Sequence, residues 1–246
     1  MHRAARTALP LDPPVVGGRG SRRVGGLGKG GAGFFDIAPP HQGGPILAGG
    51  APVAAARGAL ILTHGRGATA ESILSLAPLL GATDLAWFAP QASGNTWYPY
   101  SFLASIPQNE PGISSGLQVL RDLVDYIEKT GIPAERIALA GFSQGACLTL
   151  EFAARHARRY GAVIGFSGGL IGPDGTPRDY AGSLAGTPVF LGCSDVDSHI
   201  PLARVHESKD VLTRLGAPVD ERIYPGMGHL VNDDEIAAAK ALLQGI

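Results

Sequence analysis

The stretch "RIALAGFSQGACLTLEFAARHA", residues 136–157, decides the fold because it leads an apolar strand into a helix through Gly-Phe-Ser-Gln-Gly. The spacing GxSxG presents a serine nucleophile at a sharp strand-to-helix turn. Residues 136–142 have the continuous apolar character of a strand buried on both faces, and residues 144–157 continue as a helix. Ser143 stands at the turn. Gly141 and Gly145 flank it where the backbone must approach closely.

Two other stretches match the same pattern, GISSG at 112–116 and GFSGG at 165–169. The chain has 36 glycines, so the pattern alone is weak and its context must decide. GISSG follows "SIPQNEP", which is no strand, and GFSGG runs into "GLIGPDGTPRD", which is no helix. Only Ser143 has both neighbours, although an ordinary N-cap serine would occupy the same kind of position.

The composition of the chain limits the classes of protein to which it can belong. It has 246 residues, 45% of them hydrophobic, and a formal net charge of −1, as expected of a soluble globular domain. A net charge this close to zero does not favour binding to nucleic acid. The sequence contains no run of about 18 apolar residues, so no membrane-spanning helix is predicted. Cys147 and Cys193 are too few for a disulfide framework, which favours a cytoplasmic location. We expect a monomer or homodimer whose partner is a small molecule.

Residues 1–52 contain 13 glycines and 7 prolines and show no regular periodicity. They are predicted to be a disordered leader, with a catalytic domain at 53–246. The leader includes "GLGKGG" at 26–31, which matches GxGxxG, but no strand precedes it and no helix follows.

From residue 53 onward, apolar runs alternate with amphipathic helices. In "PGISSGLQVLRDLVDYIEKTG", residues 111–131, apolar residues recur at steps of three and four. This alternation predicts an α/β fold with a mainly parallel sheet and helices on both faces. The expected strands are 58–64, 85–90, 136–142, 162–167, 187–193 and 220–226, and the expected helices are 70–80, 111–131, 144–157, 201–215 and 233–245.

A serine nucleophile needs a base, and the base needs an orienting acid. His229 follows the last strand in the loop "MGHLVND" and is the candidate base, whereas His156 and His206 lie in helices. The acid is expected just past the strand at 187–193, where Asp195 and Asp197 both qualify. We favour Asp197, four residues before Pro201, and give Asp195 the role of ordering the loop. His199 is a weaker rival base.

An oxyanion hole needs a second backbone donor from the loop after an early strand. The stretch "LTHGRG" at 62–67 supplies the amide of Arg66, which acts with the amide of Gln144. Gly65, Gly67 and Ala70 also satisfy the dinucleotide pattern GxGxxG/A. That interpretation requires an acidic residue after the next strand, where the chain reads "WFAPQAS", so it is disfavoured.

The segment "QASGNTWYPYSFLASIPQNE", residues 91–110, is too long for a simple connection. Its aromatic residues are candidates for the wall of a substrate site, and the alternative is a loop pinned to the surface by its own aromatics. The candidate substrate-binding residues are Trp97, Tyr98, Tyr100 and Phe102. No insertion is large enough for a lid domain.

Taken together, the motifs resemble those of the acyl-protein thioesterase, phospholipase and carboxylesterase group of serine esterases, which have the α/β-hydrolase fold. "LTHGRG" resembles the HGxG segment of that group, "AGFSQGACLTL" its nucleophile segment, "DVDSHIPL" its D-x-x-V/I-P acid loop, and "YPGMGH" its histidine loop. The resemblance spans about residues 53–246. It implies a triad of Ser143, Asp197 and His229, and its acid-loop register favours Asp197. Cys193 and Ser194 depart from the histidine and glycine that the group has ahead of the acid.

The resemblance implies a serine hydrolase that cleaves small carboxylic esters or thioesters through an acyl-enzyme, with neither metal nor organic cofactor. The same triad would serve a lysophospholipid, a lactone or a small amide. An alternative of another class is a non-catalytic ligand-binding protein with the hydrolase fold, which would predict damage to the triad or to the oxyanion loop.

Overall fold

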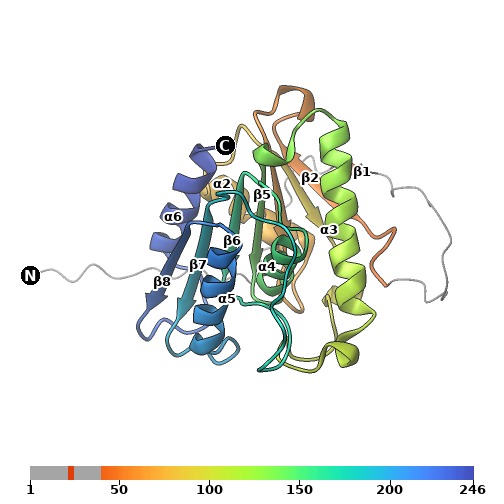
Figure 1. Ribbon diagram of the computed structural model, residues 1–246. Helices are drawn as coiled ribbons and strands as arrows, with labels where there is room; N and C mark the ends of the chain where they lie inside the picture. The colour runs from red at the N-terminus through yellow and green to blue at the C-terminus, as the bar shows by residue number, and fades with distance from the viewer. Residues whose placement is uncertain (1–21, 25–39) are drawn as a thin grey trace, which may run out of the picture.

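The computed structural model describes residues 22–24 and 40–246, which fold around one sheet of eight strands in the order β1-β2-β4-β3-β5-β6-β7-β8 (Figure 1). The strands from β3 to β8 pair in parallel, whereas β1 and β2 join the sheet antiparallel beside β4. The strands are β1 Arg22–Val24, β2 Ile46–Gly50, β3 Ala59–Thr63, β4 Ala86–Pro90, β5 Ile137–Phe142, β6 Ala162–Phe166, β7 Val189–Ser194 and β8 Val219–Tyr224. The six strands predicted from the sequence are β3 to β8, each within two residues of its expected ends.

Helices cover both faces of the sheet, as predicted. Helices α3, α4 and α5 pack into one hydrophobic cluster, and α1, α2 and α6 pack into a second cluster on the opposite face. The helices are α1 Ala70–Leu74, α2 Leu76–Leu79, α3 Gly112–Lys129, α4 Gln144–Arg155, α5 Leu202–Arg214 and α6 Asp233–Gln244. Short 3-10 turns lie at Val53–Ala55, Ser93–Asn95, Ile106–Asn109 and Ala134–Arg136.

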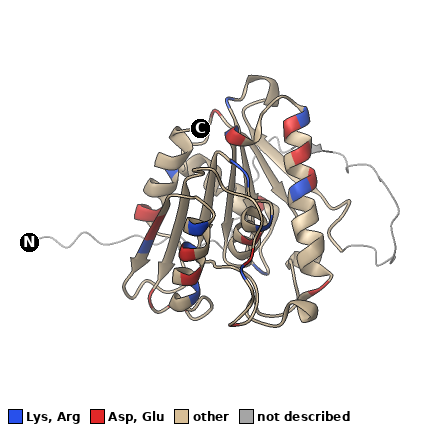
Figure 2. Ribbon diagram, viewed as in Figure 1, with Lys and Arg blue, Asp and Glu red and all other residues tan. Residues whose placement is uncertain are grey.

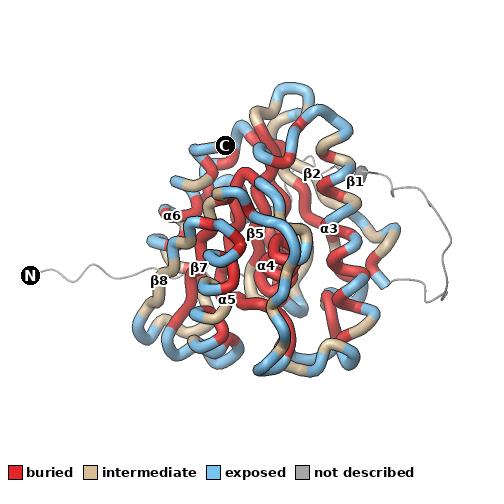
Figure 3. The backbone as a smooth tube through the Cα atoms, in the orientation of Figure 1, coloured by how far each residue is buried: buried red, intermediate tan, exposed pale blue. Residues whose placement is uncertain are grey.

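Burial follows the sequence pattern that predicted these elements. Strands β3 and β6 are buried along their whole length, and Figure 3 shows the buried sheet between helices whose outer surfaces are exposed. The apolar stripe of α3 faces the sheet and is buried from Ile113 to Ile127. Charged residues gather on the outer helices, as Figure 2 shows for α3 and α5, and strands β5 to β7 carry none. Asn232 caps α6 by accepting a hydrogen bond from the amide of Glu235.

The predicted domain boundary at residue 52 needs correction. Strand β2 pairs with β4 at five positions, and its residues Ile46 and Ala48 pack against the core. Just before it, the buried His41 ring bonds to the carbonyl of Trp97 (2.9 Å). Residues 40–52 therefore belong to the domain. The sequence hid this strand because "ILAGG" is short, half-exposed and rich in glycine. The GLGKGG segment at 26–31 and most of the predicted leader lie outside the described residues.

The connections between elements are loops and single turns, and no large lid domain is inserted within residues 40–246. None of the described helices combines the length and the apolar character needed to cross a membrane.

Candidate active site

Ser143 occupies a strained backbone position between β5 and α4. Its φ and ψ are 54° and −120°, a conformation that costs free energy in any residue with a side chain and persists only where the surroundings enforce it. Thr63 enforces it, because its hydroxyl contacts the carbonyls of Ala140 (3.1 Å) and Gly145 (2.9 Å) on either side of the turn. A Cβ atom at Gly145 would overlap the backbone of Thr63, so a glycine is required there. The turn between β5 and α4 thus holds the Ser143 hydroxyl above the edge of the sheet.

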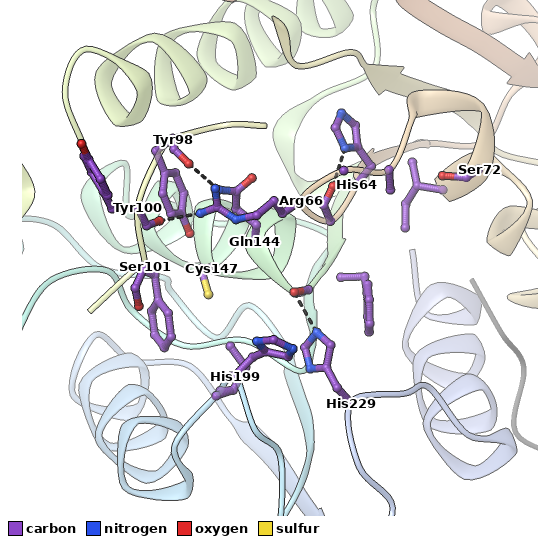
Figure 4. Close-up of a pocket in the computed structure, with 18 of the residues that line it drawn as sticks. His64, Arg66, Ser72, Tyr98, Tyr100, Ser101, Gln144, Cys147, His199 and His229 are labelled. Carbon is purple, nitrogen blue, oxygen red and sulfur yellow. Dashed lines mark hydrogen bonds between the residues drawn. The ribbon is translucent and has the colours of Figure 1, made fainter. Parts of the chain in front are cut away.

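A chain of hydrogen bonds links Ser143 to His229 and His229 to Asp197. The Nε2 atom of His229 lies 2.8 Å from Ser143 Oγ, and its Nδ1 lies 2.7 Å from Asp197 Oδ2 (Figure 4 shows the first bond). His229 lies in the loop after β8 and Asp197 in the loop after β7. Both loops lie at the edge of the sheet where Ser143 follows β5. The structure therefore brings together the three residues that the sequence predicted.

The environment of Asp197 keeps its carboxylate ionised. Burial by itself would raise the pKa, but the bond from His229 and the amides of His199 and Ile200 outweigh it, so the pKa of Asp197 is lowered from 3.8. Its side chain is fully buried. A buried carboxylate in this position fixes the tautomer and the orientation of the histidine ring.

The rival residues occupy other positions. Asp195 is exposed and accepts a hydrogen bond from the amide of Gly226 (2.7 Å), which ties the acid loop to the histidine loop. The ring of His199 stacks edge-on against that of His229 at 4.7 Å between centroids, but no hydrogen bond joins it to Ser143. His156 ends α4, and His206 bonds to Glu221.

The serines of the two other GxSxG stretches have different surroundings. Ser114 lies in the first turn of α3 and bonds to Glu110. Ser167 follows β6 and is fully buried. Neither forms a hydrogen bond to a histidine among the described residues.

The loop after β3 is built to present backbone amides. Burial lowers the pKa of His64, so its ring is neutral, with Nε2 accepting the Ala92 amide (3.1 Å) and Nδ1 donating to the Gly65 carbonyl (2.8 Å). The amides of Arg66 and Gln144 find no hydrogen-bond acceptor in the part of the chain that the structure describes. Amides fixed in this way can bind an oxyanion without reorganising.

The side chain of Gln144 fastens the aromatic segment that follows β4. Its Oε1 accepts the amide of Trp97 (2.8 Å) and its Nε2 donates to the carbonyl of Tyr98 (2.8 Å). From the sequence we expected only the amide of Gln144 to have a role. No pattern in the sequence indicated that its side chain is a clamp, because the partners are backbone atoms of a distant loop.

The pocket beside Ser143 has a volume of about 760 Å³ and is lined by twenty residues. Tyr98, Tyr100 and Phe102 are among them, with Tyr100 59% exposed at the rim (Figure 4). Trp97 is not. It is fully buried below the pocket and donates from its indole nitrogen to the carbonyl of His64 (2.9 Å). Trp97 therefore supports the loop after β3, and we withdraw it from the candidate substrate contacts. Within the described residues, no group of three or more acidic, histidine or cysteine side chains converges as metal ligands would.

Comparison with known proteins agrees with this architecture. The profile of the phospholipase/carboxylesterase family matches residues 50–245. Among solved structures, a phospholipase/carboxylesterase from Dyadobacter fermentans is 45% identical, with a TM-score of 0.79, and the match covers 81% of this chain and 95% of that one. Solved neighbours of this kind have the α/β-hydrolase fold, as predicted.

Curated relatives include several proteins called acyl-protein thioesterase 1. The one from Eremothecium gossypii is 29% identical over 232 residues, covering 89% of this chain and 85% of the relative. The one from Gibberella zeae is 29% identical over 148 residues, covering 57% of this chain, and the match spans about three fifths of that relative's length (61%). The chain therefore belongs to the phospholipase/carboxylesterase family.

Proposed function

We propose that the chain is a serine hydrolase that cleaves small carboxylic esters or thioesters through an acyl-enzyme. In this proposal Ser143 is the nucleophile, His229 the general base and Asp197 the acid that orients the base. The observation that carries the proposal is the continuous hydrogen-bond chain from Ser143 Oγ through His229 to Asp197, which opens into a pocket. The membership in an esterase family supports the same reaction class.

Acylation follows from this geometry. His229 donates from Nδ1 to Asp197 and accepts the Ser143 proton at Nε2, and Ser143 Oγ attacks the ester carbonyl carbon. The carbonyl oxygen gains a negative charge and receives hydrogen bonds from the amides of Arg66 and Gln144. His229 then returns the proton to the leaving alcohol or thiol, and the acyl group stays on Ser143.

Deacylation repeats these steps with water. His229 removes a proton from a water molecule, the hydroxide attacks the acyl-enzyme, and the proton goes to Ser143 Oγ as the carboxylic acid leaves. The ionised Asp197 stabilises the imidazolium in both halves of the reaction. Apart from the substrate and water, every group that the proposed mechanism uses is a side chain or amide of this chain.

The pocket supports small esters as substrates. Its volume of about 760 Å³ suits a drug-sized molecule, and Tyr98, Tyr100 and Phe102 form an aromatic wall on one side. With free thiols at Cys147 and Cys193, a cytoplasmic location is part of the proposal, as is action as a monomer or homodimer.

Hydrolysis of a 4-nitrophenyl ester series from acetate to decanoate tests the proposal. The parent should turn over the short esters, and Ser143→Ala should lose at least about 10³ of the rate while its circular dichroism spectrum is unchanged. The chain-length profile then measures the pocket. An inert parent, or an active Ser143→Ala variant, would overturn the proposal.

A further inference from the structure

The candidate pocket has an unusual charge pattern. Arg66 is the only formally charged side chain among its twenty lining residues, and the lining contains no aspartate or glutamate. The acid of the proposed triad, Asp197, has a fully buried side chain that bonds to His229. The imidazole rings of His64, His199 and His229 add no negative charge. The pocket therefore presents one positive charge and no carboxylate to a ligand.

The Arg66 guanidinium is held in place without being neutralised. It donates to the carbonyls of Pro99 (2.8 Å) and Tyr100 and to the hydroxyl of Thr96 (3.1 Å), all neutral oxygens. Across the described residues, no carboxylate forms an ion pair with it, in contrast to Arg178 and Arg204, which both pair with Glu207. An arginine fixed by neutral partners keeps its full charge for another group, and less side-chain entropy is lost on binding.

Two N–H groups of Arg66 form no hydrogen bond to the described residues. A guanidinium has five N–H donors, and the contacts above occupy three of them. The side chain is exposed at the mouth of the pocket, on the same side as Tyr98 and Tyr100 (Figure 4). Because the amide of Arg66 is a proposed oxyanion donor, its guanidinium lies only one side-chain length from the scissile carbonyl.

We propose that Arg66 selects ester substrates that carry a carboxylate a few bonds from the scissile ester. The proposal rests on the serine-hydrolase function above and names its substrate class. The planar fork of arginine matches the two oxygens of a carboxylate, and charge-assisted hydrogen bonds of this kind are stronger than neutral ones. A neutral ester of the same shape would leave this charge without a partner.

Two matched pairs of substrates test the proposal, one for each side of the ester. 3-Acetoxybenzoate and 3-acetoxybenzamide differ by a charge on the leaving group, and 4-nitrophenyl hydrogen adipate and 4-nitrophenyl adipamate differ by a charge on the acyl group. In at least one pair we expect kcat/KM to favour the anion by about tenfold, mainly through KM. The preference should shrink as salt screens the charge.

Variants separate charge from support of the loop. Arg66→Gln should bring the ratio of anionic to neutral kcat/KM close to one, whereas Arg66→Lys should retain part of the preference. Any loosening of the loop at residues 96–100 lowers kcat/KM alike for both substrates of a pair. The ratio of the two kcat/KM values therefore isolates the effect of the charge. Arg214→Gln, which removes the same charge from the exposed end of α5, is the matched control and should keep the full preference.

The outcomes distinguish this proposal from the function on which it rests. If the parent hydrolyses neither member of either pair, nor any 4-nitrophenyl ester, the serine-hydrolase function fails. If its kcat/KM is the same for the neutral and the anionic ester in both pairs, or if Arg66→Gln keeps the anionic preference, only the role of Arg66 is overturned.

Discussion

Two aspartates that are two residues apart in the sequence have separate roles in the structure. Asp197 is buried and bonds to His229, whereas Asp195 is exposed and bonds to the amide of Gly226. The first contact orients the ring that moves a proton in the proposed mechanism, and the second holds one loop against another. Substitutions at the two positions should therefore differ in size and in kind.

Asp197→Asn should lower kcat by about 10³ to 10⁴, because an amide no longer favours the tautomer of His229 that accepts a proton from Ser143. Asp195→Ala is the matched control and should cost less than about tenfold, since it removes one exposed hydrogen bond. Steady-state kinetics on a single short ester measure both. A larger loss in Asp195→Ala than in Asp197→Asn would contradict the division of roles.

Glu235 should make the stability of the molecule depend on pH. The side chain is fully buried at the start of α6, and one of its carboxyl oxygens has no hydrogen-bond partner among the residues that the structure describes. Burial raises its pKa to about 7, although the bond from the amide of Asn232 opposes the shift. An unfolded glutamate titrates near 4.5, so between that pH and about 7 the folded state keeps a proton that the unfolded state has lost.

Stability should therefore be greatest at the lower end of this window and should fall as the pH rises toward 7. The loss is roughly 1.4 kcal/mol for each pKa unit of the shift. Glu235→Gln removes the titrating group, so its melting temperature should change less across the window. Calorimetry of both proteins at a series of pH values measures this, and parallel curves would show that Glu235 is not the cause.

At the scale of elements, the sequence was most informative where one periodicity dominated. Strands such as β5 and β6 are buried on both faces and read as apolar runs, and the stripe of α3 repeats at helical spacing. Strand β2 was missed because it lies near the edge, where half-burial and glycine leave no pattern. The role of Trp97 was also misjudged, since an aromatic residue in a pocket loop can face either the ligand or the core.

The segment at 91–110 should depend on the side chain of Gln144. Gln144→Ala keeps the amide proposed for the oxyanion hole but leaves the buried amide of Trp97 without an acceptor, and it leaves the carbonyl of Tyr98 with only the Thr96 hydroxyl as a donor. We expect a loss of about 2 kcal/mol in the free energy of unfolding and a higher KM, because the pocket wall is no longer fixed. Denaturant unfolding and ester kinetics measure the two effects. Gln118→Ala, an exposed glutamine of α3, should change neither.

At the scale of the whole molecule, topology explains why the three proposed catalytic residues could be predicted from positions so far apart. Strands β5, β7 and β8 run parallel, so the loops after them meet at one edge of the sheet. The order of serine, aspartate and histidine along the chain then places the three side chains together. The contacts of Arg66 and Gln144 could not be predicted in this way, because they depend on the path of an irregular loop.

Residues 40–52 should contribute to the stability of the domain. Residues 40–52 supply β2, which covers the edge of β4, and His41, whose ring bonds to the Trp97 carbonyl and accepts the Ser93 amide. A chain that begins at residue 53 should therefore be less stable than one that begins at residue 40. Because the β2–β4 pairing is lost together with the bonds of His41 to Ser93, Trp97 and Ser115, we expect a loss of at least about 3 kcal/mol in the free energy of unfolding, or roughly 10 °C in melting temperature. Equal melting temperatures would return the boundary to residue 52, and a lower melting temperature in the shorter chain would establish that β2 contributes to the stability of the domain.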